Sequence, residues 1–207
     1  MWNKTCCFKM LSVIICLAAI GTFRLTADDG QVLAKFDFEG QSPLVDWGIG
    51  VNEKYAPFGQ WKPEALPCAL KIDAEGSHAG QACVSIETKK GMEEAQVMRL
   101  YTGGINIKAV ASEAGRVRVR FFVRTEGVRE NAVSVSMLER DAKQPIGNVG
   151  GKSSLIAIPP SPSWTEIDKT EYFDSNTKSL ILMFVFNLKE FDGGTIWLDD
   201  ISVEQVK

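Results

Sequence analysis

The sequence predicts an all-β protein, a sandwich or barrel of antiparallel strands. Nine or ten short segments alternate apolar and polar residues, and Gly, Pro, Asn and Asp separate them at regular intervals. The alternation is clearest in residues 115–127, where valine and phenylalanine fall on one face and arginines on the other. No segment shows the 3.6-residue period of an amphipathic helix, so strands are expected throughout the folded part of the chain.

The expected strands follow in chain order. They cover residues 32–40, 68–75, 82–88, 95–102, 115–127, 132–140, 153–158, 164–173, 179–187 and 195–206. The turn-forming sequence GSHAG separates the second strand from the third and predicts a hairpin. Residues 179–187 are apolar on both faces, which is typical of a strand in the middle of a sheet, with one face covered by a loop or by groove residues. Residues 51–67 contain three prolines and are expected to form a long loop.

Residues 1–27 have the order of a secretory signal peptide. Two lysines precede an apolar run that ends at Ile20, and small residues follow up to Ala27. The run is too short for a confident membrane span, which needs about 20 residues. The residues before Cys16 lack the leucine and the small residue of a lipid-attachment box. We therefore expect cleavage, export to the periplasm or the extracellular space, and a mature domain of residues 28–207 without a membrane span.

The charge of the mature domain argues against one class of partner. Removing the three basic residues of the leader from the 23 of the chain leaves 20 against 26 acidic residues, a net charge of −6. Nucleic-acid binding requires a basic surface that neutralises phosphates, so no nucleic-acid partner is expected. The length fits one domain, which we expect to be a monomer.

Two of the five cysteines lie in the mature domain. Cys68 and Cys83 form either a disulfide, as exported proteins permit, or a pair of buried thiols. The chain has one histidine, His78, and no CxxC motif. A zinc site of Cys and His ligands is therefore not expected.

Acidic residues interrupt both the first and the last expected strand. Asp37 and Glu39 stand in the apolar sequence FDFEG, and Asp199 and Asp200 are adjacent in TIWLDDISVEQV. Adjacent strand residues face opposite sides, so one of the last two faces inward, where an unpaired carboxylate is costly. If the two strands pair, the four carboxylates converge and suit a hard cation such as calcium. The alternatives are a solvated face or pairing with arginines.

Four motifs occur in order across residues 32–205. They are FDFEG followed by DWG, then GRVRVRFFVRTEG, WTEI and GGTIWLDDISVE. Together they resemble the carbohydrate-binding modules of the jelly-roll, galactose-binding-like type, families 4, 9 and 22 and their relatives. The resemblance implies a jelly roll of two antiparallel sheets, a structural calcium near the terminal strands, and sugar binding without catalysis. It also implies that Glu39 and Asp199 match the metal positions best, followed by Asp37 and Asp200.

Aromatic residues concentrate in one segment that is rich in polar residues, Pro and Gly. It holds Trp47, Tyr55, Phe58 and Trp61. Sugars present flat C–H faces that stack on aromatic rings. The segment is therefore either a sugar-binding platform or a lid packed over an open sheet face. In a platform, Tyr55 and Trp61 are the preferred stacking residues, because Trp47 in DWG resembles a family position that often only packs.

A row of arginines gives a second candidate ligand site. Arg116, Arg118 and Arg120 project from one face of one strand, about 7 Å apart by strand rise. On a groove, Arg118 and Arg120 would bind an acidic polysaccharide through bidentate hydrogen bonds. The alternative is a convex, solvated face on which neighbouring strands supply acidic partners.

The function expected from these features is a secreted, non-catalytic module that binds a polysaccharide or oligosaccharide by aromatic stacking. The first alternative is a structural or adhesion module of the cell surface that binds no sugar. A small jelly-roll lyase or glycoside hydrolase is the second. It is disfavoured because no spacing selects a pair of carboxylates and no Ser/His/Asp order forms around His78.

Overall fold

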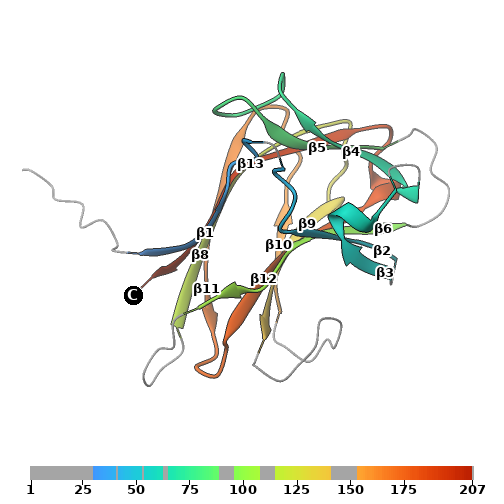
Figure 1. Ribbon diagram of the computed structural model, residues 1–207. Coiled ribbons are helices and arrows are strands. Elements are labelled where there is room, and N and C mark those ends of the chain that lie inside the picture. The colour runs from blue at the N-terminus through green and yellow to red at the C-terminus, as the bar shows by residue number, and fades with distance from the viewer. Residues whose placement is uncertain are drawn as a thin grey trace, which may run out of the picture.

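The computed structural model of the protein describes most of the chain from residue 30 to residue 206. The described residues are 30–40, 42–52, 54–62, 65–88, 96–107, 115–140 and 153–206. They form two antiparallel sheets packed face to face (Figure 1). The expected signal peptide, with Cys16, lies outside the described residues. No helix that the structure describes is long and apolar enough to cross a membrane.

The six-stranded sheet, sheet A, joins the two ends of the described chain. Its strands lie in the order β11 (Thr165–Phe173), β8 (Gly115–Glu126), β13 (Thr195–Val206), β5 (Cys83–Thr88) and β4 (Cys68–Asp73), and β1 (Gln31–Phe36) also pairs with β13. β1 runs antiparallel to β13 from Gln31, opposite Gln205, to Phe36, opposite Ile201 (Figure 1). The predicted pairing of the first and last strands is therefore confirmed, as is the β4–β5 hairpin.

The second sheet, sheet B, has seven strands. Their order is β10 (Ser153–Ile158), β9 (Val133–Arg140), β12 (Ser179–Asn187), β6 (Val97–Thr102), β2 (Trp47–Val51) and β3 (Lys54–Pro57), and β7 (Ile105–Asn106) pairs with β12. β12 lies inside the sheet, as predicted, and both its faces are apolar. Leu182 faces the other sheet, whereas Ile181 is only 4% exposed on the opposite side.

The core between the sheets is built from the inward residues of the alternating strands. The inward valine and phenylalanine side chains of β8 are buried, and Leu182 and Phe184 of β12 meet them from sheet B. Full burial of each such side chain stabilises the fold by about 1.5–3 kcal/mol. Trp47 closes one part of this core, with its ring centroid 4.9 Å from that of Phe36 and 6.2 Å from that of Phe184.

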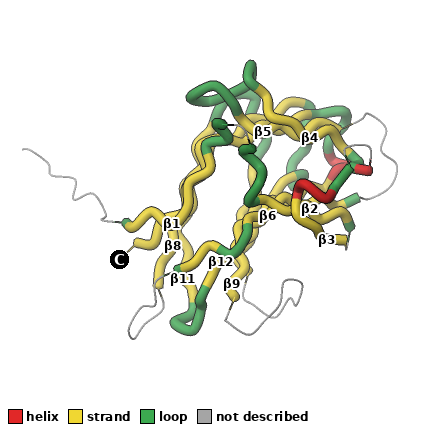
Figure 2. Tube along the Cα trace, viewed as in Figure 1, coloured by secondary structure: helices red, strands yellow, loops and turns green. Residues whose placement is uncertain are grey.

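All ten predicted strands are present, although β1 ends at Phe36, before Asp37 and Glu39. One predicted loop is wrong in part. Residues 47–57 form β2 and β3, a hairpin in which Gly50 pairs with Tyr55. Figure 2 shows that strands dominate the described chain; the short helices η1 (Phe58–Gln60) and η3 (Leu188–Glu190) are single 3₁₀ turns. β2 was missed because glycines alternate with its apolar residues, and glycine weakens the strand signal.

Candidate functional site

The outer face of sheet B carries two tyrosine rings that lie directly on the backbone of β2. Trp47 and Ile49 of this strand point into the core, so Gly48 and Gly50 occupy the outward positions. A Cβ atom at Gly48 would lie 2.2 Å from Cζ of Tyr101, and one at Gly50 would lie 2.6 Å from Cε1 of Tyr55. The two glycines therefore leave the space that the rings occupy.

One ring is fixed and the other is exposed. Tyr101 is 8% exposed and its hydroxyl donates a hydrogen bond to the carbonyl oxygen of Ala56, 3.3 Å away. Tyr55 is 43% exposed, and its ring meets that of Tyr101 edge-on at 6.0 Å between centroids. Burial, followed by the nearby Tyr55, raises the pKa of Tyr101 above its ordinary value, so its hydroxyl stays protonated at neutral pH.

An arginine completes this group of residues. The guanidinium carbon of Arg99 lies 5.8 Å from the centroid of the Tyr55 ring, within the range of a cation–π contact. We call the group formed by Tyr55, Tyr101 and Arg99 on Gly48 and Gly50 the tyrosine platform. Its composition, an aromatic ring with a planar polar group beside it, is typical of sites that bind flat polar ligands.

The strands beside the platform continue the same face. On β12, Val185 lies opposite Arg99 and Met183 lies opposite Tyr101. On β9, the next strand of the sheet, Ser134 lies opposite Val185 and Ser136 lies opposite Met183. Two apolar side chains thus separate the platform from the buried Ser136 and the half-buried Ser134, so the face offers apolar contact area and the hydroxyl of Ser134.

The four aromatic residues predicted to stack on sugar have different surroundings. Trp47 is 1% exposed and packs among phenylalanines, so its assignment to a binding surface is wrong: the ring offers no free face. Phe58 and Trp61 are half-buried against the core, and the indole of Trp61 donates to the carbonyl oxygen of Ile49 at 3.0 Å. Only Tyr55 is exposed. Sugar contact by Phe58 and Trp61 stays a prediction.

The arginine row lies on the outer face of sheet A and is paired within the protein. Nε of Arg118 donates to Oδ1 of Asp168 at 2.8 Å, and its Nη2 donates to Oδ2 of the same residue. Arg120 pairs with Glu204. Hydrogen bonding from Arg118, the largest cause, holds the pKa of Asp168 below its ordinary value. The structure thus has the ion-paired alternative, and ligand contact by Arg118 and Arg120 stays a prediction.

The carboxylates of Glu39 and Asp199 converge on the β4–β5 loop, as the metal prediction requires. Oε1 of Glu39 accepts the N–H groups of Gln81 at 2.6 Å and Ala82 at 2.9 Å. Oδ2 of Asp199, which is fully buried, accepts the N–H group of His78 at 2.8 Å. Backbone amides therefore supply hydrogen bonds to both carboxylates.

Asp199 has further donors, and its burial still affects its ionisation. The N–H of Ala79 lies 3.4 Å from Oδ2, and the N–H of Asp200 lies 2.8 Å from Oδ1. Desolvation outweighs these bonds and raises the pKa of Asp199 above its ordinary value. A bulge interrupts β13 at this point, where Asp200 has a φ of 48°.

The other two predicted metal residues have partners of their own. Asp37 pairs with Lys35 at 3.8 Å. Oδ2 of Asp200 lies 3.0 Å from Nδ1 of His78, whose ring stacks on that of Phe122 with 3.6 Å between centroids. Among the residues that the structure describes, no group of three or more His, Cys, Asp or Glu side chains could hold a metal ion. Calcium would need backbone carbonyls as additional ligands.

The two cysteines are free thiols at opposite ends of the β4–β5 hairpin. Cys68 pairs in register with Thr88, whereas Cys83 pairs with Asp73, five residues along β4. That separation is about 17 Å by strand rise, too far for a disulfide. Burial raises the pKa of each thiol to about 12, so the alternative of two buried thiols is confirmed.

Comparison with known proteins identifies the fold but not a family. No protein-family model and no curated protein matches the chain. Among solved structures, the family 11 carbohydrate-binding module of Clostridium thermocellum, in complex with a β-1,3-1,4-mixed-linked tetrasaccharide, matches with a TM-score of 0.51 and 14% identity. The match covers 84% of this chain and 94% of that one.

Two longer proteins contain a similar unit. The CBM22-1 and GH10 modules of xylanase 10B from Clostridium thermocellum, complexed with xylohexaose, match with a TM-score of 0.52 and 11% identity, over 86% of this chain and 29% of that chain. The enzymatically active domain of tailspike protein 4 from bacteriophage CBA120 matches with a TM-score of 0.55 and 9% identity, over 79% of this chain and 20% of that chain. These similarities confirm the jelly-roll sandwich that the sequence resemblance implied.

Proposed function

We propose that this protein is a secreted, non-catalytic carbohydrate-binding module that holds a polysaccharide or oligosaccharide on the tyrosine platform. The observation that carries the proposal is the position of Tyr55, which is 43% exposed on a strand pair whose glycine leaves room for the ring. A large aromatic side chain in such a position can stack on the C–H face of a sugar ring. Arg99 beside it supplies hydrogen-bond donors for sugar hydroxyls.

The chemistry of the same face supports binding rather than cleavage. Hydrolysis of a glycosidic bond usually employs two carboxylates that flank it. The platform and the adjoining positions of β12 and β9 consist of Tyr, Arg, Gly, Met, Val and Ser. Among the described residues at these positions, a sugar meets stacking and hydrogen-bonding groups but no pair of carboxylates. The fold, which two carbohydrate-binding modules share, agrees with this role by analogy.

Replacing the exposed tyrosine tests the proposal. Tyr55→Ala is expected to weaken retention on gels containing neutral polysaccharides, such as xylan or mixed-linked β-glucan, by about tenfold or more, since a stacked ring is lost. Tyr172→Ala is the matched control, because Tyr172 is 71% exposed but lies on the outer face of sheet A. If Tyr55→Ala and Tyr172→Ala are retained equally well, the tyrosine platform is not the sugar-binding site.

The adhesion alternative has a distinct outcome in the same experiment. A structural module predicts that the wild-type chain shows no retention on any polysaccharide gel, with or without Tyr55.

Secretion is checked separately: the N-terminus of the exported protein, determined by mass spectrometry, is expected at Asp28.

Calcium stays a prediction at Glu39 and Asp199. Both carboxylates hold one loop, and Oε2 of Glu39 accepts no hydrogen bond among the described residues. An ion that binds only the folded state raises the melting temperature. We expect a higher melting temperature in millimolar calcium than in EDTA, and no such difference in Glu39→Gln. Equal melting of the wild type in both conditions would mean that backbone amides alone compensate these charges.

A further inference from the structure

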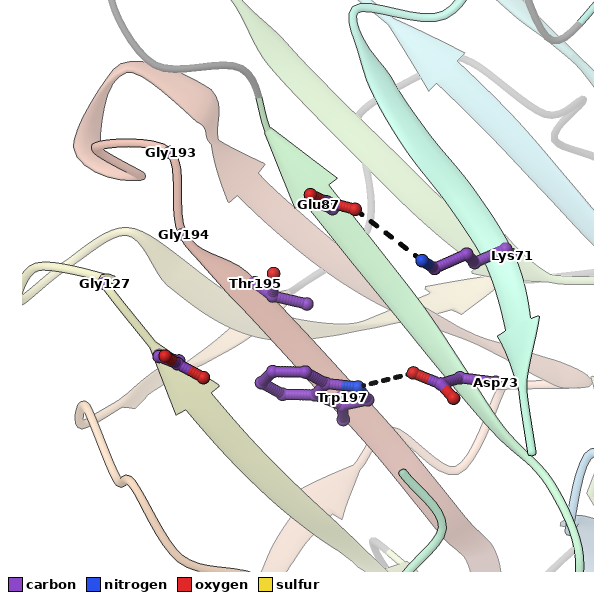
Figure 3. Close-up of a pocket in the computed structure, with 9 residues that line it drawn as sticks. Lys71, Asp73, Glu87, Gly127, Gly193, Gly194, Thr195 and Trp197 are labelled. Carbon is purple, nitrogen blue, oxygen red and sulfur yellow. Dashed lines mark hydrogen bonds and ion pairs between the residues drawn. The ribbon is translucent and has the colours of Figure 1, made fainter. Parts of the chain in front are cut away.

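A pocket opens on the outer face of sheet A, on the other sheet from the tyrosine platform. Its volume is about 330 Å³, within the range of small-molecule sites. Residues of β4, β5, β8 and β13 line it, together with glycines of two turns (Figure 3). It is therefore assembled from four strands of one rigid sheet rather than from a single loop.

Strand register places two carboxylates on either side of a small residue in this pocket. Thr195 of β13 pairs with Glu87 of β5 and with Glu126 of β8. Residues directly opposite each other in antiparallel strands point to the same face. Thr195 is therefore flanked by both acids. Figure 3 shows Glu87 on the neighbouring strand and Trp197 two positions along β13 from Thr195.

The walls of the pocket are held by contacts within the protein. The indole of Trp197 donates to Oδ2 of Asp73 at 3.0 Å, and the guanidinium carbon of Arg124 lies 4.1 Å from the Trp197 ring centroid. Nζ of Lys71 lies 3.6 Å from Oε2 of Glu87 (Figure 3). The ring and two of the acids are thus oriented before any ligand binds, which lowers the entropic cost of binding.

Two polar side chains in or beside the pocket, those of Glu126 and Ser85, have no partner among the described residues. Among the described residues, the Glu126 side chain makes no hydrogen bond or ion pair, although it lines the cavity. Close by, Ser85 lies between Lys71 and Trp197 in the strand register, and its buried hydroxyl also lacks a hydrogen-bond partner. Glu126 is therefore free to accept hydrogen bonds from a molecule in the pocket.

The charge of the lining limits the chemistry of that molecule. Three carboxylates, of Asp73, Glu87 and Glu126, outnumber the two cations nearby, which are the ammonium group of Lys71 and the guanidinium of Arg124 beside the Trp197 ring. The hydrogen bond from Trp197, the largest cause, holds the pKa of Asp73 below its ordinary value, so this acceptor remains charged at neutral pH. The excess of negative charge repels uronates and sulfated sugars, whereas the carboxylates accept hydrogen bonds from neutral hydroxyls.

We infer that this pocket is a second saccharide site, which takes one neutral sugar unit by hydrogen bonds from its hydroxyls to Glu87 and Glu126, beside the Trp197 indole. The glycine turns at 127 and 193–194 form part of the lining without side chains, so a sugar linked to a longer chain is not blocked there. The inference does not depend on the tyrosine platform, because the two sites lie on different sheets.

The test is a titration of the full mature chain followed by NMR at the Trp197 indole N–H signal, assigned with Trp197→Phe. The probes are the methyl β-glycosides of glucose, galactose and xylose, with galacturonate as the anionic counterpart. We expect at least one neutral glycoside to shift the signal saturably. Glu87→Gln combined with Glu126→Gln is expected to weaken that binding about tenfold or more, because charged acceptors are lost.

Two controls separate this site from the platform. Glu166→Gln alters an exposed acid on the outer face of sheet A outside the pocket, and it is expected to leave the titration unchanged. Tyr55→Ala is also expected to leave it unchanged, even where it abolishes retention on polysaccharide gels. The inference is overturned if no neutral glycoside shifts the signal, if galacturonate binds as well as they do, or if the double variant binds like the wild type.

Discussion

On the outer face of sheet A, charged side chains meet charged side chains: Arg118 binds Asp168 and Arg120 binds Glu204. On the outer face of sheet B, the rings of Tyr55 and Tyr101 lie on bare glycines, and the neighbouring strand adds methionine and valine. Both sheets contribute buried apolar side chains to one core, so hydrophobic burial stabilises both of them in the same way. The difference lies in the surroundings of the exposed groups: on sheet A Arg118 and Arg120 are held in ion pairs, whereas on sheet B the exposed ring of Tyr55 lies on a glycine.

Removing the carboxylate of Asp199 is expected to have the largest effect. In Asp199→Ala the N–H groups of His78, Ala79 and Asp200 lose their acceptor. These bonds are partly buried, hydrogen bonds to a charged group contribute about 1.5–3 kcal/mol each, and the relief of a desolvated charge offsets part of this. We expect a loss of about 2–4 kcal/mol in the free energy of unfolding at pH 7, measured by urea denaturation.

The pH dependence of that loss has a definite sign. Burial raises the folded-state pKa of Asp199, so the folded protein binds a proton more readily than the unfolded chain. The wild type therefore gains stability as pH falls through the raised pKa toward the ordinary value of 3.8. This contribution is absent from Asp199→Ala. An identical pH profile of the two proteins in this window would contradict the assignment of the shift to burial.

Two alanine substitutions on β2 compare a fixed ring with a movable one. Gly48→Ala places a methyl group 2.2 Å from Cζ of Tyr101, which is nearly buried and bonded to Ala56. Overpacking of this kind costs about 1–3 kcal/mol. Gly50→Ala meets the exposed ring of Tyr55 at 2.6 Å, and this ring can swing into solvent. We expect little change in its stability, within about 0.5 kcal/mol, but weaker retention on polysaccharide gels.

The two variants distinguish a glycine needed for stability, under the nearly buried Tyr101, from a glycine needed for sugar binding, under the exposed Tyr55. Thermal denaturation should rank Gly48→Ala below Gly50→Ala, whereas gel retention should fall in both. If Gly50→Ala retains sugar like the wild type, the position of the Tyr55 ring over Gly50 does not matter for binding. The platform would then need a different geometry.

Much of the fold could be predicted because its signals are local. Residues 115–127 and 132–140 alternate so regularly that their inward faces follow from the sequence. The hairpin of β2 and β3 was not predicted because the outward positions of β2 are Gly48 and Gly50, which carry no side chains. The apolar residues Trp47, Ile49 and Val51 do alternate, which is the signal that could have revealed the strand.

The candidate sites were less predictable because they depend on pairing between distant strands. Tyr55 was identified from its aromatic neighbourhood, but Tyr101 and Arg99 come from β6, whose position beside β2 no local pattern reveals. The acids of Glu39 and Asp199 do converge, yet the amides of the β4–β5 loop that meet them leave no trace in the sequence. Pocket residues such as Glu87 and Glu126 come together only through the register of β13.

Breaking the ion pair of Arg118 and Asp168 is expected to have a small effect on stability. Asp168→Asn removes one charge of a pair whose side chains are 31% and 36% exposed, and exposed pairs contribute about 0–1 kcal/mol.

The pH dependence has the opposite sign to that of Asp199, because the pKa of Asp168 is lowered in the folded state. The contribution of Asp168 to stability is present above the unfolded pKa and is lost as pH falls through the folded pKa. Urea denaturation at pH 7 and in acid should show the difference between wild type and Asp168→Asn disappearing at low pH, with Glu166→Gln as the control. A difference that persists unchanged in acid, or in about 1 M salt, would mean that Asp168 supports the strand by packing rather than by charge. The ion pairs would then contribute little to stability, and charge pairing would not distinguish the outer face of sheet A from that of sheet B.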